Sequence, residues 1–268
     1  MLFKSLKKKL TVLLISAGMA YLPLQANAWS MIGHRVVGEV ADAYLTAKTK
    51  AAVKAILGNE SLGMSANWGD FIKSDTAYNY MYNWHFINLD PDMSREAVYQ
   101  YAETNKAPNL YNKIIDLIAE LKRPGLSATQ KKLDLRMLVH MIGDLHQPMH
   151  TAHKDDLGGN KISVLWFGQK SNIHKVWDEQ LVDYQQLSYT EYTKAINHPS
   201  AVQLYNWRKS SLKESLFESY SICSKIYSTV KPDDKLSYRY NFDWVNTVNE
   251  QLLKGGIRLA KVLNDIYG

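Results

Sequence analysis

The sequence predicts a single-domain, mainly α-helical protein over residues 29–268. Three observations support this fold class. Apolar residues recur at helical spacing along most of the chain, no Pro-, Gly- or Ser-rich linker divides it, and only residues 161–168 read as a short strand. A chain of this length can bury one large core, so we expect one domain.

The first 28 residues read as a secretory signal peptide. They begin with four lysines within residues 4–9, continue with the apolar stretch Leu10–Ala20, and end in the cleavage pattern Ala26-Asn27-Ala28. The apolar stretch is too short to span a bilayer comfortably. We therefore expect an exported protein, periplasmic or secreted, that starts at Trp29 and has no integral membrane contact after cleavage.

Charge and cysteine content limit the possible functions. The formal net charge is +6, and removal of the four leader lysines leaves about +2. Bulk basicity is then no argument for nucleic-acid binding, which would need a local basic patch. Cys223 is the only cysteine, so an intrachain disulfide is impossible. Bound metal is another way to make an exported fold rigid.

Four helical regions are predicted from apolar stripes. They cover residues 35–57, 95–122, a central helix from about Ala128 into the 140s, and most of residues 188–268. Gly58-Asn59 is expected to end the first region, and Ser127 to cap the central helix.

The central helix carries the stretch His140-Met-Ile-Gly-Asp144-Leu-His146-Gln-Pro148-Met-His150 within an apolar run. His140 and Asp144 are four residues apart and project from one helical face. Pro148 disturbs the helix and redirects His150. Buried His and Asp side chains are costly unless paired. Either a metal ion or hydrogen bonds can pair them, and these residues alone do not decide between the two.

Other candidate ligands lie in separate segments. His174 and Asp178 again have helical i,i+4 spacing, and His85 lies in an aromatic-rich stretch fifteen residues after Asp70. His34, near a helix start, reads by itself as a capping or surface histidine. The loop Gly158-Gly159-Asn160 permits close backbone approach to a ligand, although glycines alone also fit an ordinary surface turn.

Taken in order, these residues resemble the S1/P1 nuclease family of trinuclear zinc enzymes, which are related to bacterial zinc phospholipase C. The resemblance covers about residues 29–178, with a compatible helical tail, and implies a phospholipase C/P1 nuclease-like fold. Its most specific motifs are Trp29 after the cleavage site, Trp68-Gly-Asp70, His140-x-x-Gly-Asp144-x-His-Gln-Pro-x-His150, Gly158-Gly-Asn160 and Asn172-x-His174-x-x-Trp-Asp178.

The resemblance implies three zinc ions. The first would be bound by Asp70, His85, His140 and Asp144. The second would be bound by the amino nitrogen and carbonyl oxygen of Trp29, by His34 and by Asp144, which would bridge two ions. The third would be bound by His150, His174 and Asp178. Nitrogen and carboxylate ligands without cysteine are typical of catalytic zinc.

The implied activity is hydrolysis of single-stranded DNA and RNA to 5′-phosphate products, with removal of 3′-phosphates from nucleotides. Asp70 would orient the attacking hydroxide, and Lys73 would lie near the phosphate; the alternative for Lys73 is a solvent-facing side chain. Phe86 would stack on a base, an interaction tolerant of base identity. Asn160 would contact the base. Asn88 stands where fungal members have an acidic residue, which leaves base preference open.

Two other functions fit parts of the pattern. A zinc-dependent phospholipase C would use the same metals, although Phe86 and the Gly-Gly-Asn160 loop favour the nuclease. A non-catalytic zinc-binding exported protein is a second alternative, against which Asp70 and open metal positions argue. His146 and His153 stay outside the ligand sets, either as supporting residues near the site or as surface residues. We expect a monomer.

Overall fold

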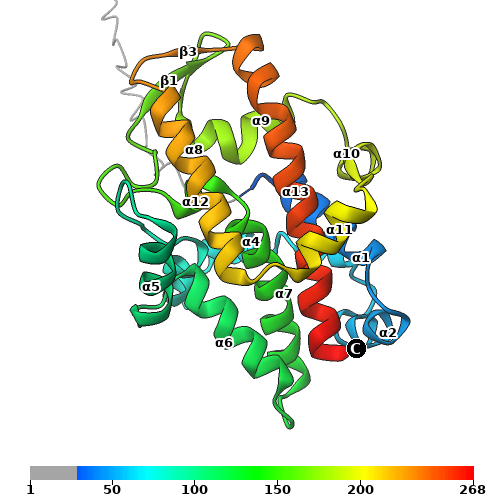
Figure 1. The fold of residues 1–268 in the computed structure, drawn as a ribbon. Helices are drawn as coiled ribbons and strands as arrows, with labels where there is room; N and C mark the ends of the chain where they lie inside the picture. The colour runs from blue at the N-terminus through cyan, green and yellow to red at the C-terminus, as the bar shows by residue number, and fades with distance from the viewer. Residues whose placement is uncertain (1–28) are drawn as a thin grey trace, which may run out of the picture.

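The computed structural model describes residues 29–268 as one mainly α-helical domain (Figure 1). The predicted signal peptide, residues 1–28, lies outside the described residues. The amino-terminal half contains α1 (Met31–Ala43), α2 (Ala47–Leu57), α3 (Leu62–Ser65), α4 (Trp68–Phe71), η1 (Ile72–Ser74), η2 (Thr76–His85), α5 (Arg95–Thr104) and α6 (Leu110–Lys122). The predicted fold class is confirmed.

The central helix α7 (Ala128–Leu145) organises the remaining elements. It is followed by η3 (Pro148–Thr151), β1 (Ser163–Trp166), β2 (Gln169–Asn172), α8 (Ile173–Lys175), η4 (Val176–Gln180), α9 (Leu181–Asp183), α10 (Tyr189–Ile196), α11 (Ala201–Lys209), α12 (Leu212–Thr229), β3 (Lys235–Leu236) and α13 (Tyr238–Tyr267). As predicted, Ser127 caps α7 by accepting a hydrogen bond from the Gln130 amide at 3.2 Å.

The second half of α7 lies in the core. Every residue from Met137 to Leu145 is buried, because α1, α6 and α13 all pack against this helix (Figure 1). Apolar burial on this scale is the main stabilising force of the fold. It also means that any polar side chain on this half of α7 must find its partners inside the protein.

The regions 35–57 and 95–122 were each predicted as one continuous helix. This prediction was wrong, because the structure divides each of them into two helices. The 35–57 region breaks before Thr46, whose side chain caps α2 by accepting the Thr49 amide at 3.1 Å. The 95–122 region breaks at Asn105–Asn109, where Pro108 precedes the cap of α6. Side chains that bond nearby backbone amides compete with helix continuation. By contrast, Gly58 ends α2 at a φ of 71°, as expected.

A three-stranded sheet positions one part of the site. β1 pairs antiparallel with β2, with Val164 opposite Ser171, and parallel with β3, with Leu165 opposite Lys235. The predicted strand at 161–168 is thus confirmed in a shorter form. β2 runs directly into α8, so the sheet determines where the first turn after Asn172 enters the core.

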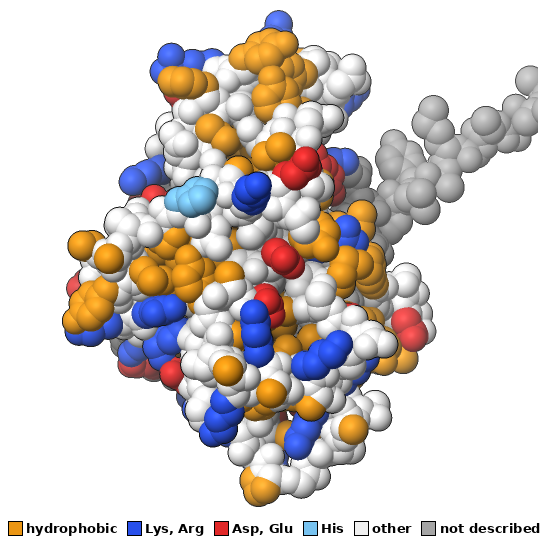
Figure 2. Space-filling model, turned by 90° about the vertical axis from the view of Figure 1, so that its right-hand side faces the viewer, with side chains coloured by type: hydrophobic (Ala, Val, Ile, Leu, Met, Phe, Trp, Pro, Cys, Tyr) orange, Lys and Arg blue, Asp and Glu red, His pale blue; other side chains and the backbone are white. Residues whose placement is uncertain are grey.

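The surface bears charges of both signs. On the face shown in Figure 2, Lys and Arg side chains are scattered among acidic and apolar ones.

His198 is exposed, as expected for a histidine before a loop proline. Over residues 29–268, no helix has both the length and the apolar character that crossing a bilayer requires.

Close packing between α1 and α13 depends on Gly256. A Cβ added there would lie 2.4 Å from the Cβ of Val40, which no side-chain adjustment relieves. We predict that Gly256→Ala lowers the free energy of unfolding by on the order of 1 kcal/mol, since overpacking outweighs the gain in helix propensity. Denaturant unfolding tests this, with Lys261→Ala on the same helix as control. Equal stability of Gly256→Ala and the parent would contradict this packing.

Candidate metal centre

Eight of the nine predicted ligand residues come together in three adjoining groups that could each hold a metal ion. The groups are His34, Asp70 and His140; His85, His140 and Asp144; and His150, His174 and Asp178. Within each group the ligand atoms all lie within 4.8 Å of one another. His140 belongs to two of the groups, so these two form one continuous cluster.

Asp144 lies at the centre of this cluster. Its carboxylate oxygens are 3.4 Å from His34 Nε2, 3.1 Å from His85 Nδ1 and 3.2 Å from His140 Nε2. These residues come from α1, the end of η2 and α7, so one buried carboxylate joins three distant segments. Asp70, on α4, completes the cluster at 3.7 Å from His140 Nε2.

The third group forms where η3, α8 and η4 meet. His174 Nε2 lies 2.9 Å from one Asp178 oxygen, and His150 Nε2 lies 3.5 Å from the other. Asp178 is part of a single π-helical turn, a rare structure that is frequent at functional sites. α7 ends at Leu145, and Pro148 starts the separate turn that carries His150, as the sequence suggested.

Backbone carbonyls determine the tautomers of three histidines. The Nδ1–H groups of His140, His150 and His174 donate to the carbonyl oxygens of Ala66, His85 and Gly158, at 2.8, 2.7 and 2.6 Å. In the neutral ring, which is the form that binds a metal ion, a nitrogen that donates to a carbonyl leaves the opposite ring nitrogen as the unprotonated acceptor. In all three residues that acceptor is Nε2, the atom that faces the carboxylates, as in metal-ligating histidines.

Several candidate ligand atoms are buried without a hydrogen-bond partner among the described residues. They are both ring nitrogens of His34, one oxygen of Asp144, Nε2 of His174 and one oxygen of Asp178. Unsatisfied buried polar atoms cost about 1–3 kcal/mol each, and proteins rarely keep several together. The donor set of imidazole and carboxylate suits zinc. The residues present therefore fit metal ions better than a purely hydrogen-bonded core.

The charges in the cluster also favour ligation. Burial raises the pKa of Asp70, but His140 and Lys73 outweigh it and hold that pKa well below its usual range. Burial likewise opposes ionisation of Asp144, yet the neighbouring His140 and His150 hold its pKa well below normal. Burial lowers the pKa of His85 to about 3. Ionised carboxylates beside a neutral imidazole are the protonation states that metal binding requires.

Two glycines let rings approach the backbone. A Cβ at Gly69 would lie 2.5 Å from the His140 ring, and one at Gly143 would lie 2.7 Å from His34 Nδ1. Both glycines precede a candidate ligand, Asp70 or Asp144, by one position. Each Gly-Asp pair thus provides a carboxylate, and its glycine leaves space for a histidine that comes from elsewhere in the chain.

Gln147 is a functional candidate that the sequence analysis missed. It is fully buried, its amide donates to Asp178 Oδ1, and its side-chain oxygen accepts the Met149 amide at 2.7 Å. It therefore orients a candidate ligand while stabilising the turn that carries His150. Its place between two histidines in the His146-Gln-Pro-x-His150 motif was the available signal.

His146 points away from the cluster although it lies on the same helix end. It is buried, and Arg258 donates to its Nε2 at 3.1 Å, so a surface role is excluded. Burial, together with Arg258, lowers its pKa to about 3.

His153 is half-buried and stacks on Tyr227, with ring centroids 4.2 Å apart.

Two further predicted residues lie within or beside the centre. Lys73 is only 12% exposed and its Nζ lies 2.7 Å from Asp70 Oδ1, so the solvent-facing alternative is wrong. Trp29 is fully buried and lies just before Ser30, the N-cap of α1. The next residue, Ser30, donates its amide to the Asp178 carbonyl, which connects the start of the described chain to the third group.

The three predicted base-contacting residues adjoin the third group. Phe86 and Asn88 are half-buried on one side of an extended segment, whose Ile87 amide donates to the His150 carbonyl at 2.9 Å. Asn160 is half-buried and follows Gly158, the partner of His174. The Gly-rich loop is therefore more than a surface turn, because its backbone fixes a candidate ligand.

Comparison with known proteins agrees with this geometry. The S1/P1 Nuclease family model matches residues 29–268. Endonuclease 3 of Arabidopsis thaliana is 29% identical, over 90% of both chains. Nuclease P1 of Penicillium citrinum is 27% identical, over 90% of this chain and 98% of its own. Nuclease S1 of Aspergillus oryzae is 25% identical, over 93% and 96%. The full length of the described domain and its buried His/Asp centre thus match one family: the chain belongs to the S1/P1 nucleases and is a nuclease.

Proposed function

We propose that this chain is an exported zinc-dependent nuclease that hydrolyses single-stranded DNA and RNA to 5′-phosphate products and also removes 3′-phosphates from nucleotides. One observation carries the proposal: three adjoining groups of His and Asp side chains, all buried except the partly buried Asp70, contain several ligand atoms that have no hydrogen-bond partner among the described residues. Three zinc ions would be bound by the nine residues named from the sequence. We expect the protein to act as a monomer in the periplasm or outside the cell.

The chemistry divides between the metal and the chain. When bound, zinc supplies a water of lowered pKa and neutralises phosphate charge. Asp70 accepts a hydrogen bond from the attacking water and orients it. Lys73, held 2.7 Å from Asp70, presents a cation where the phosphate enters. Water breaks the P–O3′ bond, so that O3′ leaves with a proton and the phosphate stays on the 5′ side of the next nucleoside.

Preference for single strands follows from Phe86. A base can stack on this ring only after it is splayed out, which pairing in a duplex resists. Asn88 and Asn160 offer amide groups for the edge of the same base. A phospholipase C would use the same metal ligands but has no need of these residues, and a non-catalytic zinc-binding protein has no need of the Lys73–Asp70 pair.

One assay separates the three functions. Purified protein that starts at Trp29 is incubated with denatured DNA, and separately with phosphatidylcholine vesicles, with and without a chelator. We expect chelator-sensitive release of 5′-phosphorylated fragments and no diacylglycerol. Diacylglycerol without DNA cleavage would establish the phospholipase, and no turnover of either substrate would favour the binding protein.

Asp144→Asn tests the metal assignment. We predict that the variant loses nearly all activity and contains less zinc, because the carboxylate is proposed to bridge two ions and carries a negative charge that an amide lacks. Zinc is counted by atomic absorption. Asp116→Asn, on the surface of α6, is the matched control. A variant that retained three zinc ions and full turnover would rule out this role for Asp144.

Phe86→Ala tests the stacking surface. We predict weaker nucleotide binding by about 1–3 kcal/mol, the value of one base stacked on an aromatic ring, with zinc content unchanged. Calorimetric titration of a nonhydrolysable 3′-nucleotide analogue measures this. Tyr205→Ala, an exposed aromatic residue on α11, is the control. Identical affinities of the Phe86 variant and the parent would remove Phe86 from the binding site.

The free amino terminus is expected to complete the centre. A model α-amino group has a pKa of about 8, so a metal ion readily displaces its proton, whereas an amide nitrogen is a poor ligand. We predict that a protein that starts with Gly-Trp29 has much lower activity and less zinc than one that starts at Trp29. The two are compared at equal concentration and zinc supply. Equal turnover and stoichiometry would contradict ligation by the amino terminus.

A further inference from the structure

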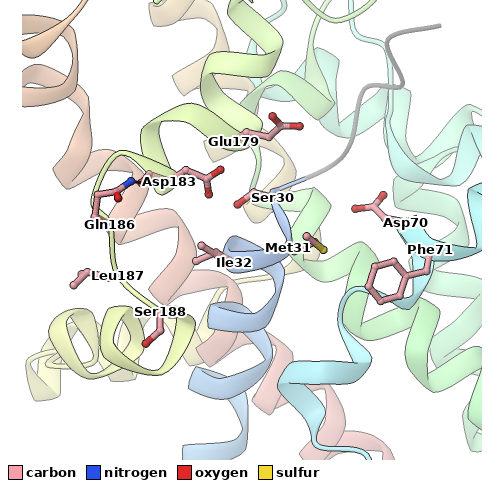
Figure 3. A pocket seen from close by; sticks show the side chains of 10 residues that line it. All are labelled: Ser30, Met31, Ile32, Asp70, Phe71, Glu179, Asp183, Gln186, Leu187 and Ser188. Carbon is pink, nitrogen blue, oxygen red and sulfur yellow. Dashed lines mark hydrogen bonds between the residues drawn. The ribbon is translucent and has the colours of Figure 1, made fainter. Parts of the chain in front are cut away.

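A cavity of about 770 Å³ opens beside Asp70 (Figure 3), and Phe86 is not among its lining residues. Its floor is the start of α1, one wall is the end of α4, and the opposite wall is formed by η4, α9 and the loop that follows α9. It is lined by Ser30, Met31, Ile32, Asp70, Phe71, Glu179, Asp183, Gln186, Leu187 and Ser188. Its volume falls in the range of sites for small organic ligands.

The cavity has an apolar surface next to the proposed reaction centre. Phe71 follows Asp70 directly and is 53% exposed, and Met31 from α1 is equally exposed. In Figure 3 both side chains lie beside the Asp70 carboxylate. Exposed aromatic rings are stacking surfaces for bases of any identity. Phe71 therefore offers an exposed stacking surface next to Asp70, separate from the half-buried ring of Phe86.

The charged part of the lining is acidic. Besides Asp70 it includes the carboxylates of Glu179 and Asp183, and the ten lining residues include no Lys, Arg or His. Glu179 is 3.6 Å from Lys175, whereas Asp183 has no ion pair among the described residues. An acidic lining repels phosphate but accepts hydrogen bonds from the amino groups of bases.

We propose that this cavity binds the nucleoside that keeps the 5′-phosphate, on the far side of the scissile bond from the nucleoside at Phe86. Phe71 stacks on its base, and Asp183 with Glu179 accepts hydrogen bonds from an exocyclic amino group. The cavity thereby favours adenine, cytosine and guanine over uracil and thymine at this position. The inference rests on the proposed nuclease function and names a second substrate subsite.

Dinucleotides and 3′-mononucleotides separate the two subsites. ApN takes up water to give adenosine and the 5′-monophosphate of N, and both bases are bound. Adenosine 3′-phosphate takes up water to give adenosine and phosphate, with nothing in the cavity. We expect Phe71→Ala to lower kcat/KM on ApA about tenfold or more, as one lost stacking contact implies, and to leave hydrolysis of the 3′-nucleotide within about twofold.

Further variants distinguish binding from a structural effect on Asp70. Phe71→Tyr retains a stacking ring and should restore dinucleotide hydrolysis, and Phe242→Ala, an exposed aromatic residue on α13, should change neither substrate. An equal loss on both substrates, or no loss on ApA, would overturn the assignment of Phe71. An inactive parent would contradict the nuclease function, whereas an active parent with an unaffected Phe71→Ala variant contradicts only the cavity.

Base preference tests the acidic lining. The parent should hydrolyse ApA and ApC with a higher kcat/KM than ApU, and adenosine 5′-phosphate should inhibit more strongly than uridine 5′-phosphate. Asp183→Asn gives the side chain a donor in place of one acceptor. The difference in kcat/KM between the dinucleotides and the difference in inhibition between the two 5′-phosphates should therefore both become smaller. Asp265→Asn, on the surface of α13, is the matched control. No preference in the parent, or an unchanged preference in Asp183→Asn, would overturn the role of the carboxylates.

Discussion

The structure depends on one buried carboxylate, that of Asp144. An ionised group of this kind is costly in a protein core unless charged or hydrogen-bonding partners surround it. Histidines from α1, η2 and α7 lie within 3.4 Å of its oxygens. Burial opposes ionisation of this carboxyl, but His140, His150 and His34 hold its pKa far below normal. The fold thus tolerates Asp144 only where separate segments meet, and the same meeting point creates the candidate metal centre.

Helix α7 can hold this group because its surroundings are rigid. Its second half is enclosed by α1, α6 and α13, and glycines at 69 and 143 bring His140 and His34 into contact with the backbone. The ligand geometry is therefore fixed by packing rather than by flexible loops, and active sites need such preorganisation. The loop residue Gly158 does the same for His174 through its carbonyl oxygen.

Two histidines of α7 illustrate how surroundings assign roles. Burial tends to lower the pKa of both. The carboxylates of Asp144 and Asp70 more than compensate at His140 and raise its pKa. At His146 the guanidinium of Arg258 acts in the same direction as burial and brings the pKa to about 3. His140 faces the proposed ions. His146 instead accepts a hydrogen bond from Arg258, which connects the end of α7 to α13.

The helical class, the central helix with its Ser127 cap and the ligand candidates could all be predicted from the sequence, since periodicity and motif spacing are local properties. It did not reveal the breaks before Thr46 and around Pro108, where side-chain capping wins over apolar periodicity. Three features became visible only in the folded chain: His146 lies outside the cluster, Gln147 orients Asp178, and Phe71 borders a cavity. These depend on contacts between segments up to 112 residues apart, which no local pattern records.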